Sequence, residues 1–197
     1  MRKTFFLLVI FIIVSACHRN SSSPIINKVI VNGDFEQDLN SGWQRNTSGL
    51  KYSDEIARYQ NLDGDNDFEL VIEKINAGHI KLYQTIDFPT SDLQFSAKAN
   101  LRAIEYNPNA SYWAAAAICL RYLNDSYQLL GETRIVSKTA HCPWQNTSTL
   151  HLINVPHMDS WYNYSFKISE ELSHLSGITV SDIKKLQIVV MDTTNGC

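Results

Sequence analysis

The chain has 197 residues, of which 44% are hydrophobic and 19% are charged, and its formal net charge is −3. This length is that of a single domain with a substantial core. The sequence contains no block of basic residues, which argues against a nucleic-acid-binding protein.

The first sixteen residues have the pattern of a secretory signal peptide. Two basic residues precede an unbroken apolar run at residues 5–14, which is too short for a membrane-spanning helix of about 20 residues. The run leads into V-S-A-C at residues 14–17, which resembles the lipobox of bacterial lipoproteins. The resemblance implies that residues 1–16 are removed and that Cys17 is acylated. The alternative is an ordinary signal peptide followed by a chance cysteine.

This processing defines the expected domain organisation. Loss of residues 1–16, with their two positive charges, would leave 181 residues with a net charge of −5. Residues 17–24 are then the lipidated cysteine and a polar tether, and residues 25–197 are the folded domain. Several acyl chains anchor a protein stably, so we expect a location in the bacterial cell envelope, at the outer membrane. Contact with the membrane is expected through the lipid anchor alone.

Alternation of apolar and polar residues predicts that strands dominate the domain. Every second residue between 93 and 104 is apolar, as expected of a strand with one buried face. Strands are predicted at residues 68–75, 79–88, 93–104, 112–123, 130–137, 149–155, 161–168 and 185–192. A short helix is predicted at residues 170–175, capped by Ser169, and a single helical turn at residues 181–184. The spacing predicts an all-β fold, an antiparallel β-sandwich with one or two short helices.

The domain is organised around Val31–Glu36, V-N-G-D-F-E, which is followed by S-G-W at residues 41–43. Its N-G pair is a strong turn signal, and Phe35 and Trp43 are apolar anchors on either side of a polar loop. The motif resembles the opening of β-sandwich carbohydrate-binding modules of the CBM4/9/22 type, a branch of the galactose-binding-like jelly rolls. The resemblance implies a jelly roll with Phe35 and Trp43 in its core.

Later motifs extend the resemblance over most of residues 25–192. They are Q-T-I at residues 84–86 and W-x-x-Y at residues 161–164. One departure is the closing strand of the family, of the type I-D-D-I, which has no counterpart after residue 192. Its aspartate can join a calcium site in the family, so the departure bears on metal binding.

Two features concern a structural calcium ion. The resemblance implies that Glu36 helps to bind it. Separately, D-G-D-N-D at residues 63–67 offers carboxylates that can converge on a hard cation, but it lacks the spacing of an EF-hand. We favour the alternative for these residues, a solvated acidic turn before the strand at residue 68.

Cysteine and histidine patterns give one disulfide prediction and disfavour zinc. An oxidising envelope permits one disulfide among the three cysteines after Cys17. The pair Cys142–Cys197 is favoured because both lie in turn-rich stretches, which leaves Cys119 as a small buried hydrophobe. A zinc site is disfavoured because the residues that are candidate ligands have loose spacings; they are His141, Cys142, His151 and His157.

No catalytic motif is present, so a non-catalytic protein is expected. The remaining candidates for ligand binding are aromatic residues, since indole rings can stack on the apolar face of a sugar. Trp113 and Trp144 are the candidate platforms, with Arg102 and Arg121 as donors to sugar hydroxyls. The alternative for Trp113 is that it caps a strand end and packs on a loop. The expected partner is therefore a glycan, or, in the second hypothesis, a protein bound by an adhesion or scaffold lipoprotein.

Overall fold

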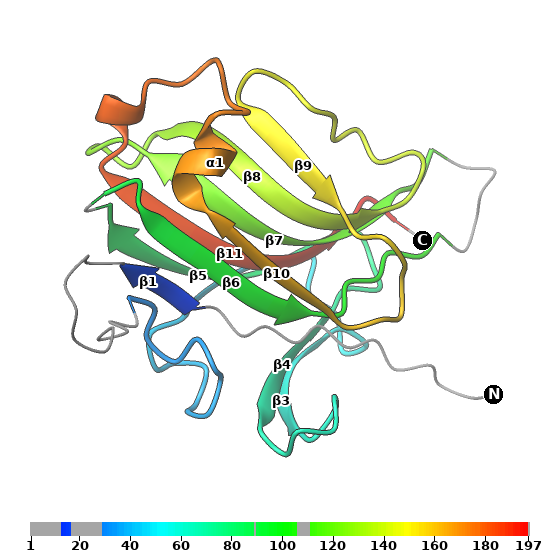
Figure 1. Ribbon diagram of the computed structural model, residues 1–197. Helices are drawn as coiled ribbons and strands as arrows, with labels where there is room; N and C mark the ends of the chain where they lie inside the picture. The colour runs from blue at the N-terminus through cyan, green and yellow to red at the C-terminus, as the bar shows by residue number, and fades with distance from the viewer. Residues whose placement is uncertain (1–12, 17–28, 89, 106–110, 197) are drawn as a thin grey trace.

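The computed structural model describes residues 13–16, 29–88, 90–105 and 111–196, and within these ranges the chain is mostly β-strand (Figure 1). The elements in chain order are β1 (Ile13–Ala16), β2 (Gln44–Ser48), β3 (Glu55–Gln60), β4 (Phe68–Glu73), β5 (Gly78–Asp87), β6 (Leu93–Ala99), β7 (Ala114–Leu123), β8 (Leu129–Lys138), β9 (Leu150–Asn154), β10 (Tyr162–Lys167), α1 (Ile168–Leu172), the 3₁₀ turn η1 (Val180–Asp182) and β11 (Lys185–Thr194). No helix in these ranges is long and apolar enough to cross a membrane.

A six-stranded sheet forms the back of the molecule, in the order β2-β5-β11-β7-β8-β9. Strand β11 lies in its middle and pairs antiparallel with both β5 and β7, so that Val189 lies opposite Tyr83 on one side and Cys119 on the other. The prediction of a wholly antiparallel fold is wrong at one edge, because β8 and β9 are parallel. The residues between them, 139–149, run back along the length of the sheet to the start of β9 (Figure 1), as a parallel pair requires.

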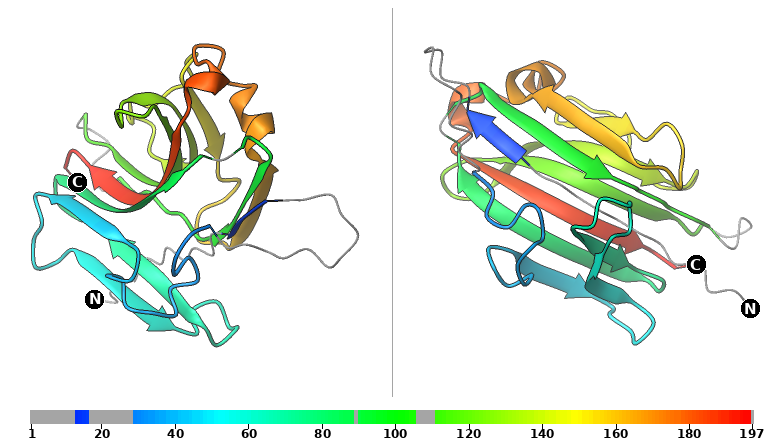
Figure 2. Two further views of the ribbon diagram at one scale, coloured as in Figure 1. Left: turned by 90° about the vertical axis from the view of Figure 1, so that its left-hand side faces the viewer. Right: turned by 60° about the horizontal axis from the view of Figure 1, so that its bottom comes forward.

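A second layer packs across this sheet. It contains β6 and β10, which pair antiparallel. This layer lies in front of the large sheet in Figure 1, and the left view of Figure 2 shows the two layers from the side. The two sheets enclose the main core. The predicted buried face of residues 93–104 is confirmed, because the alternate apolar residues are buried: Leu93, Phe95, Ala97, Ala99, Leu101 and Ala103. The predicted strand is too long, since β6 ends at Ala99.

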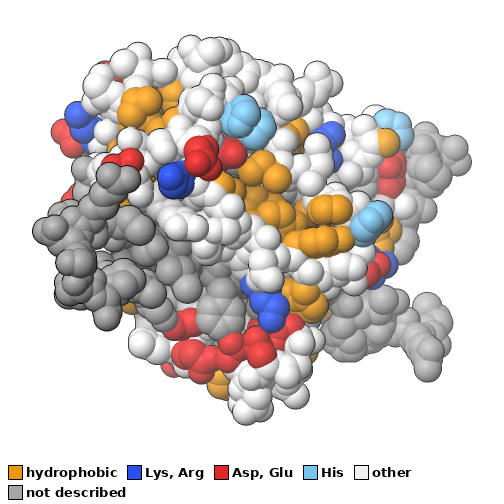
Figure 3. Space-filling view, in the orientation of Figure 1, with side chains coloured by type: hydrophobic (Ala, Val, Ile, Leu, Met, Phe, Trp, Pro, Cys, Tyr) orange, Lys and Arg blue, Asp and Glu red, His pale blue; other side chains and the backbone are white. Residues whose placement is uncertain are grey.

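The two layers do not close into a barrel. No strand pairing joins β9 to β10 in the described part of the chain, and Figure 3 shows apolar side chains at the surface between them. The third sheet is the hairpin β3–β4, which projects below the sandwich in Figure 1.

Strand β1 lies within the predicted signal peptide. Its four residues pair antiparallel with β6, from Ile13 opposite Ser96 to Ala16 opposite Leu93. Residues 1–12 and 17–24 lie outside the described residues, and so does Cys17. The signal peptide, the lipidation and the tether therefore stay predictions.

The corner at residues 32–43 confirms the predicted core positions of Phe35 and Trp43. Phe35 is fully buried, Trp43 is 5% exposed, and their rings stack with centroids 5.3 Å apart. The Trp43 indole N–H donates to the carbonyl of Asn32, whose side chain bonds the backbone of Gln37. Asn32 itself has a φ of 51°, a conformation that asparagine tolerates better than most residues. The motif thus builds a hydrogen-bonded corner with a stacked aromatic pair beneath it.

Two strands and one helix cap differ from the predictions. Strands β2 and β3 were not predicted, because β2 is polar and largely exposed and β3 shows no regular alternation of burial. The predicted cap at Ser169 is wrong. Helix α1 begins at Ile168 and has Lys167 at its N-cap, with no side-chain hydrogen bond there.

Candidate functional site

The candidate site lies on the face of the six-stranded sheet that points away from the main core, which we call the open face. On β7 the even-numbered residues from Ala116 to Tyr122 belong to the main core, whereas Ala115, Ala117 and Cys119 belong to a separate apolar cluster. The period of two along a strand places these sets on opposite faces. The open face therefore has its own small apolar floor.

One half of this floor is covered by an aromatic cluster. The rings of Trp113 and Trp144 lie with centroids 6.0 Å apart at 57°, and the Arg134 guanidinium lies 4.0 Å above the Trp144 ring. Both indoles are half-buried and pack on the floor beside Cys142. The structure thus brings together the two tryptophans that the sequence analysis singled out. It also shows the packing of Trp113 against a loop, which was the alternative for that residue.

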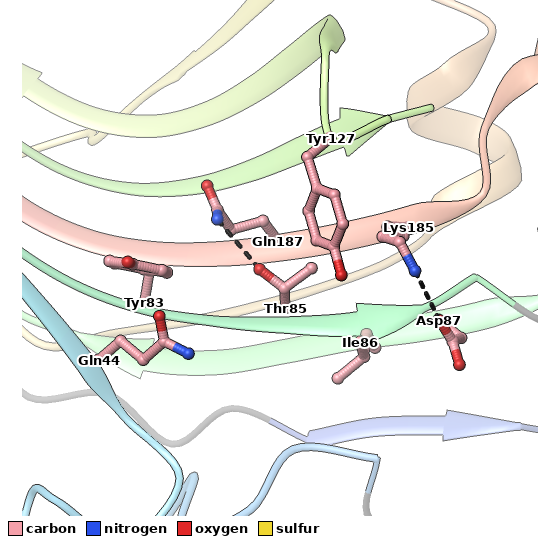
Figure 4. A pocket seen from close by; sticks show the side chains of 8 residues that line it. All are labelled: Gln44, Tyr83, Thr85, Ile86, Asp87, Tyr127, Lys185 and Gln187. Carbon is pink, nitrogen blue, oxygen red and sulfur yellow. Dashed lines mark hydrogen bonds and ion pairs between the residues drawn. The ribbon is translucent and has the colours of Figure 1, made fainter. Parts of the chain in front are cut away.

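The other half of the open face is hollowed into a pocket of about 370 Å³ (Figure 4). Its walls come from β2, β5, β11 and the β7–β8 turn, through Gln44, Tyr83, Thr85, Ile86, Asp87, Tyr127, Lys185 and Gln187. Tyr83 also packs on the apolar floor under the tryptophans. Pocket and aromatic cluster are therefore neighbouring parts of one surface.

The pocket combines two aromatic rings with fixed polar groups. Tyr127 is 64% exposed, and the Lys185 ammonium lies 4.9 Å from the centre of its ring. Gln187 donates to Thr85 at 3.0 Å, and Lys185 pairs with Asp87 at 3.1 Å. These bonds hold amide, hydroxyl and charged groups along the strands β5 and β11, beside the rings (Figure 4).

Of the two predicted arginine donors, only one lies on this face. The Arg121 guanidinium donates to the Gln187 side chain at 2.9 Å, which places it at the border of the pocket. Arg102 instead pairs with Asp159 at 2.9 Å and follows the buried residue Leu101 of the second layer. Because the main core separates the two layers, Arg102 and Arg121 are not in position to serve one ligand.

Positive charge gathers on the open face. Lys81 lies on β5 beside this surface, where burial, together with the charge of Arg121, lowers its pKa. Arg134 is balanced by a 2.8 Å ion pair with Glu132, which is itself 5% exposed. Polar ligands would therefore meet a surface with several donors.

Glu36 and the acidic turn at residues 63–67 lie next to each other. Glu36 accepts a hydrogen bond from the backbone N–H of Phe68 at 2.9 Å. In the turn, the ligand oxygens of four carboxylates lie within 4.8 Å of one another; they belong to Asp63, Asp65, Asp67 and Glu69. Figure 3 shows acidic side chains gathered over this part of the molecule.

The middle of this turn, residues 64–66, is exposed, as the interpretation favoured from the sequence expects, whereas the carboxylates on either side are less accessible. The side chain of Asp63 is 1% exposed and Glu69 is fully buried. Lys98 pairs with Asp63 and, at 3.2 Å, with Asp65. Burial, strengthened by the neighbouring carboxylates, raises the pKa of Asp67 to about 7. One oxygen of Asp67 is buried without a hydrogen-bond partner, so the donor set fits an oxygen-binding cation such as Ca²⁺.

The two cysteines in the described ranges form no disulfide with each other. Cys119 and Cys142 are both buried, and burial raises the pKa of each. The expectation of a buried Cys119 is confirmed. Cys197 lies outside the described residues, so the pair Cys142–Cys197 stays a prediction.

The four residues weighed for zinc are not brought together as one group in the described part of the chain. His141 pairs with Glu105 at 3.0 Å, whereas His151 pairs with Glu171 at 2.7 Å. His151 joins a different set, with Glu171 and His174.

The pocket residues were missed from the sequence. Tyr83 and Thr85 lie on the polar face of a correctly predicted strand, and Gln187 lies on the strand that pairs with it. The one feature of the sequence that could have indicated the pocket was the aromatic residue Tyr83 on the polar face of its strand. Tyr127 lies in the β7–β8 turn with a φ of 61°, and nothing local indicated that this turn folds over β11.

Neither the known protein-family models nor the curated proteins include a match to this chain. The function must therefore be inferred from the open face itself.

Proposed function

We propose that this chain is a lipid-anchored, non-catalytic protein of the bacterial cell envelope, with a jelly-roll sandwich that binds carbohydrate on its open face. The observation that supports this most directly is the pocket of about 370 Å³ with Tyr83 and Tyr127 beside fixed polar side chains. A sugar has an apolar face and a rim of hydroxyls. A pocket that offers aromatic faces beside amide and charged groups can satisfy both.

The groups divide by role. Tyr127 supplies the exposed ring for stacking, and Tyr83 supplies a second ring at the pocket floor. Gln187 and Gln44 offer amides to hydroxyl groups, and Arg121 holds Gln187 in place. The half-buried Trp113 and Trp144 extend the platform for a longer chain of sugars.

A glycan array of plant, host and microbial glycans tests the proposal. The matched pair of variants is Tyr127→Ala and Tyr52→Ala, since Tyr52 is an exposed tyrosine too but lies in the β2–β3 connection, away from the pocket. Loss of a stacking ring should weaken binding about tenfold, which corresponds to roughly 1.4 kcal/mol. Tyr52→Ala should bind as the parent does. An array without hits, or equal loss in both variants, would remove the carbohydrate proposal.

The second candidate is an adhesion or scaffold lipoprotein that binds a protein partner. The half-buried apolar side chains that reach the surface between β9 and β10 favour it, since apolar strips at a surface mark interaction sites (Figure 3). A chain that binds no glycan but is crosslinked to an envelope protein through this strip would support it.

The anchor is proposed from the sequence pattern alone. Acylation of Cys17 would tether the domain to the membrane through several buried acyl chains. Mass spectrometry of the N-terminal peptide should find a lipid-modified Cys17 at the mature N-terminus. Cys17→Ser should abolish both the lipid and the cleavage, whereas cleavage at another bond would contradict the assignment.

A structural Ca²⁺ is proposed for the acidic turn, with Asp63, Asp65 and Asp67 as ligands and Glu36 steadying the turn through Phe68. The ion would displace the Lys98 ammonium, which now neutralises the turn. Calcium should then raise the melting temperature in a concentration-dependent way, and Asp65→Asn should reduce that rise. An unchanged melting temperature in millimolar Ca²⁺ would contradict the proposal.

A further inference from the structure

A second, separate group of ligand atoms lies where α1 meets β9. His151 comes from β9, and Glu171 and His174 come from α1 and the turn that follows it. The backbone N–H of Gly177 donates to the carbonyl of Ser148 at 2.8 Å, which ties this turn to the start of β9. The fold thus holds His151 against Glu171 and His174, which lie twenty or more residues further along the chain.

The geometry of this group is compact. One candidate ligand atom from each of the three residues lies within 4.8 Å of the other two. His151 Nδ1 lies 2.7 Å from Glu171 Oε2, and the rings of His151 and His174 stack with centroids 4.3 Å apart at 22°. Figure 3 shows histidine side chains beside acidic ones over α1 and β9.

Burial differs among the three residues in a way that suits an open metal site. The Glu171 side chain is 8% exposed and that of His151 is 22% exposed, while His174 lies at the surface. Two ligands are therefore fixed by packing and one is free to swing. Ligand atoms bound to one tetrahedral zinc ion at about 2.0–2.2 Å lie roughly 3.4 Å apart. The present separations reach this value through side-chain rotation, most readily at His174.

We propose that His151, Glu171 and His174 bind one zinc ion, or another first-row transition-metal ion, with a fourth position open to solvent. Two imidazoles and one carboxylate are a donor set suited to Zn²⁺, whereas Ca²⁺ and Mg²⁺ favour sets made of oxygen alone. The ion takes the place of the 2.7 Å hydrogen bond that now joins His151 and Glu171. It also ties α1 to β9 across the side where the two layers are not joined by strand pairing.

The pair His141–Glu105 shows what an ordinary ion pair looks like in the same molecule. It has the same Nδ1-to-carboxylate contact, at 3.0 Å, but no second histidine joins it among the metal-binding groups of the described residues. It is therefore a matched control: a histidine–glutamate pair without the third ligand.

The test is isothermal titration of the metal-stripped, detergent-purified full chain with Zn²⁺, in a buffer with excess Ca²⁺ to saturate the acidic turn. We expect one Zn²⁺ per chain and a zinc-dependent rise in melting temperature. His174→Ala should weaken binding more than tenfold, since even loss of a residue that only supports a ligand costs about 10–100-fold. His141→Ala should bind as the parent does.

Two controls keep the result decisive. His174 is exposed, so His174→Ala should fold normally without zinc, which its melting temperature without metal will verify. Glu171→Gln keeps a hydrogen-bonding partner for His151 but removes the charge, and it should also weaken zinc binding. Absence of zinc binding in the parent, or equal zinc binding in the parent and His174→Ala, would overturn the proposal.

Discussion

The two faces of the six-stranded sheet are made by the same strands yet differ in almost every property. The face toward the main core carries large branched and aromatic residues, such as Leu120, Tyr122 and Ile188, and all three are fully buried. The open face carries small residues under two tryptophans at one end and polar side chains around a pocket at the other. The core face therefore stabilises the fold, and the open face supplies the surface that is proposed to bind a ligand.

This difference teaches where substitutions should matter for folding and where they should matter for binding. Removing a core side chain loses transfer free energy and leaves a cavity. Removing a side chain that already faces solvent does neither, and surface substitutions usually change stability by less than about 0.5 kcal/mol. The following experiments test how sharp the division is.

The largest effect is expected for Trp43→Ala in the main core. Trp43 is 5% exposed, stacks on Phe35 and donates a hydrogen bond to the carbonyl of Asn32. We expect a loss of about 3–5 kcal/mol in the free energy of unfolding, measured by denaturant melts. A loss below about 0.5 kcal/mol would mean that the corner at residues 32–43 contributes little to the stability of the core.

Asp192 is a polar exception on the core face, and it predicts a pH dependence. Burial raises its pKa to about 7 from the ordinary value of 3.8, so between these values the folded state binds a proton that the unfolded state does not. Its contribution to stability is thus full below about pH 4 and is lost as the pH rises through 7. At about 1.4 kcal/mol for each pH unit of difference the loss is at most about 4 kcal/mol, and partial exposure of the residue reduces it.

Asp192→Asn isolates this contribution. The asparagine oxygen can still accept the hydrogen bond from the backbone N–H of Lys74, which the carboxylate now accepts at 2.9 Å. The variant should gain stability relative to the parent as the pH rises from 4 to 8, in chemical denaturation at several pH values. A constant difference between the two proteins over this range would show that Asp192 does not titrate as predicted.

An intermediate effect is expected for Trp144→Ala on the open face. The indole is half-buried and lies under Arg134, so its removal loses part of an apolar contact and one cation–π contact. We expect about 1–2 kcal/mol of destabilisation and weaker glycan binding. A loss as large as that of Trp43→Ala would mean that the open face has a second core essential to folding.

The smallest effect on stability is expected for Tyr127→Ala. Its ring is 64% exposed and contacts Lys185, so the free energy of unfolding should change by less than about 0.5 kcal/mol. Together with a loss of glycan binding, this result would separate binding from stability on the open face. A large destabilisation would show that the β7–β8 turn supports the sheet.

Much of the core face could be predicted from the sequence, because local alternation and the residues 32–43 motif determine it. Strands β2 and β3 were not predicted because their own sequences carry no alternation of apolar residues. They are strands because they hydrogen-bond to the neighbouring strands β5 and β4. The pocket escaped prediction for another reason. It depends on the register that places Gln187 opposite Thr85, about a hundred residues away in the chain, and no local pattern encodes such a pairing. The same holds for the approach of His174 to His151.

The position of β11 at the centre of the large sheet has a consequence for the order of folding. The strands β5 and β7 are joined only through β11, which is the last strand of the described chain. Until it is made, the sheet exists as two fragments, β2–β5 and β7–β8–β9, each with an unpaired edge. Such edges readily pair with other chains, and pairings between distant segments form slowly. A ribosome-bound chain that ends before residue 185 should therefore be the form of this protein most prone to aggregation and most dependent on chaperones.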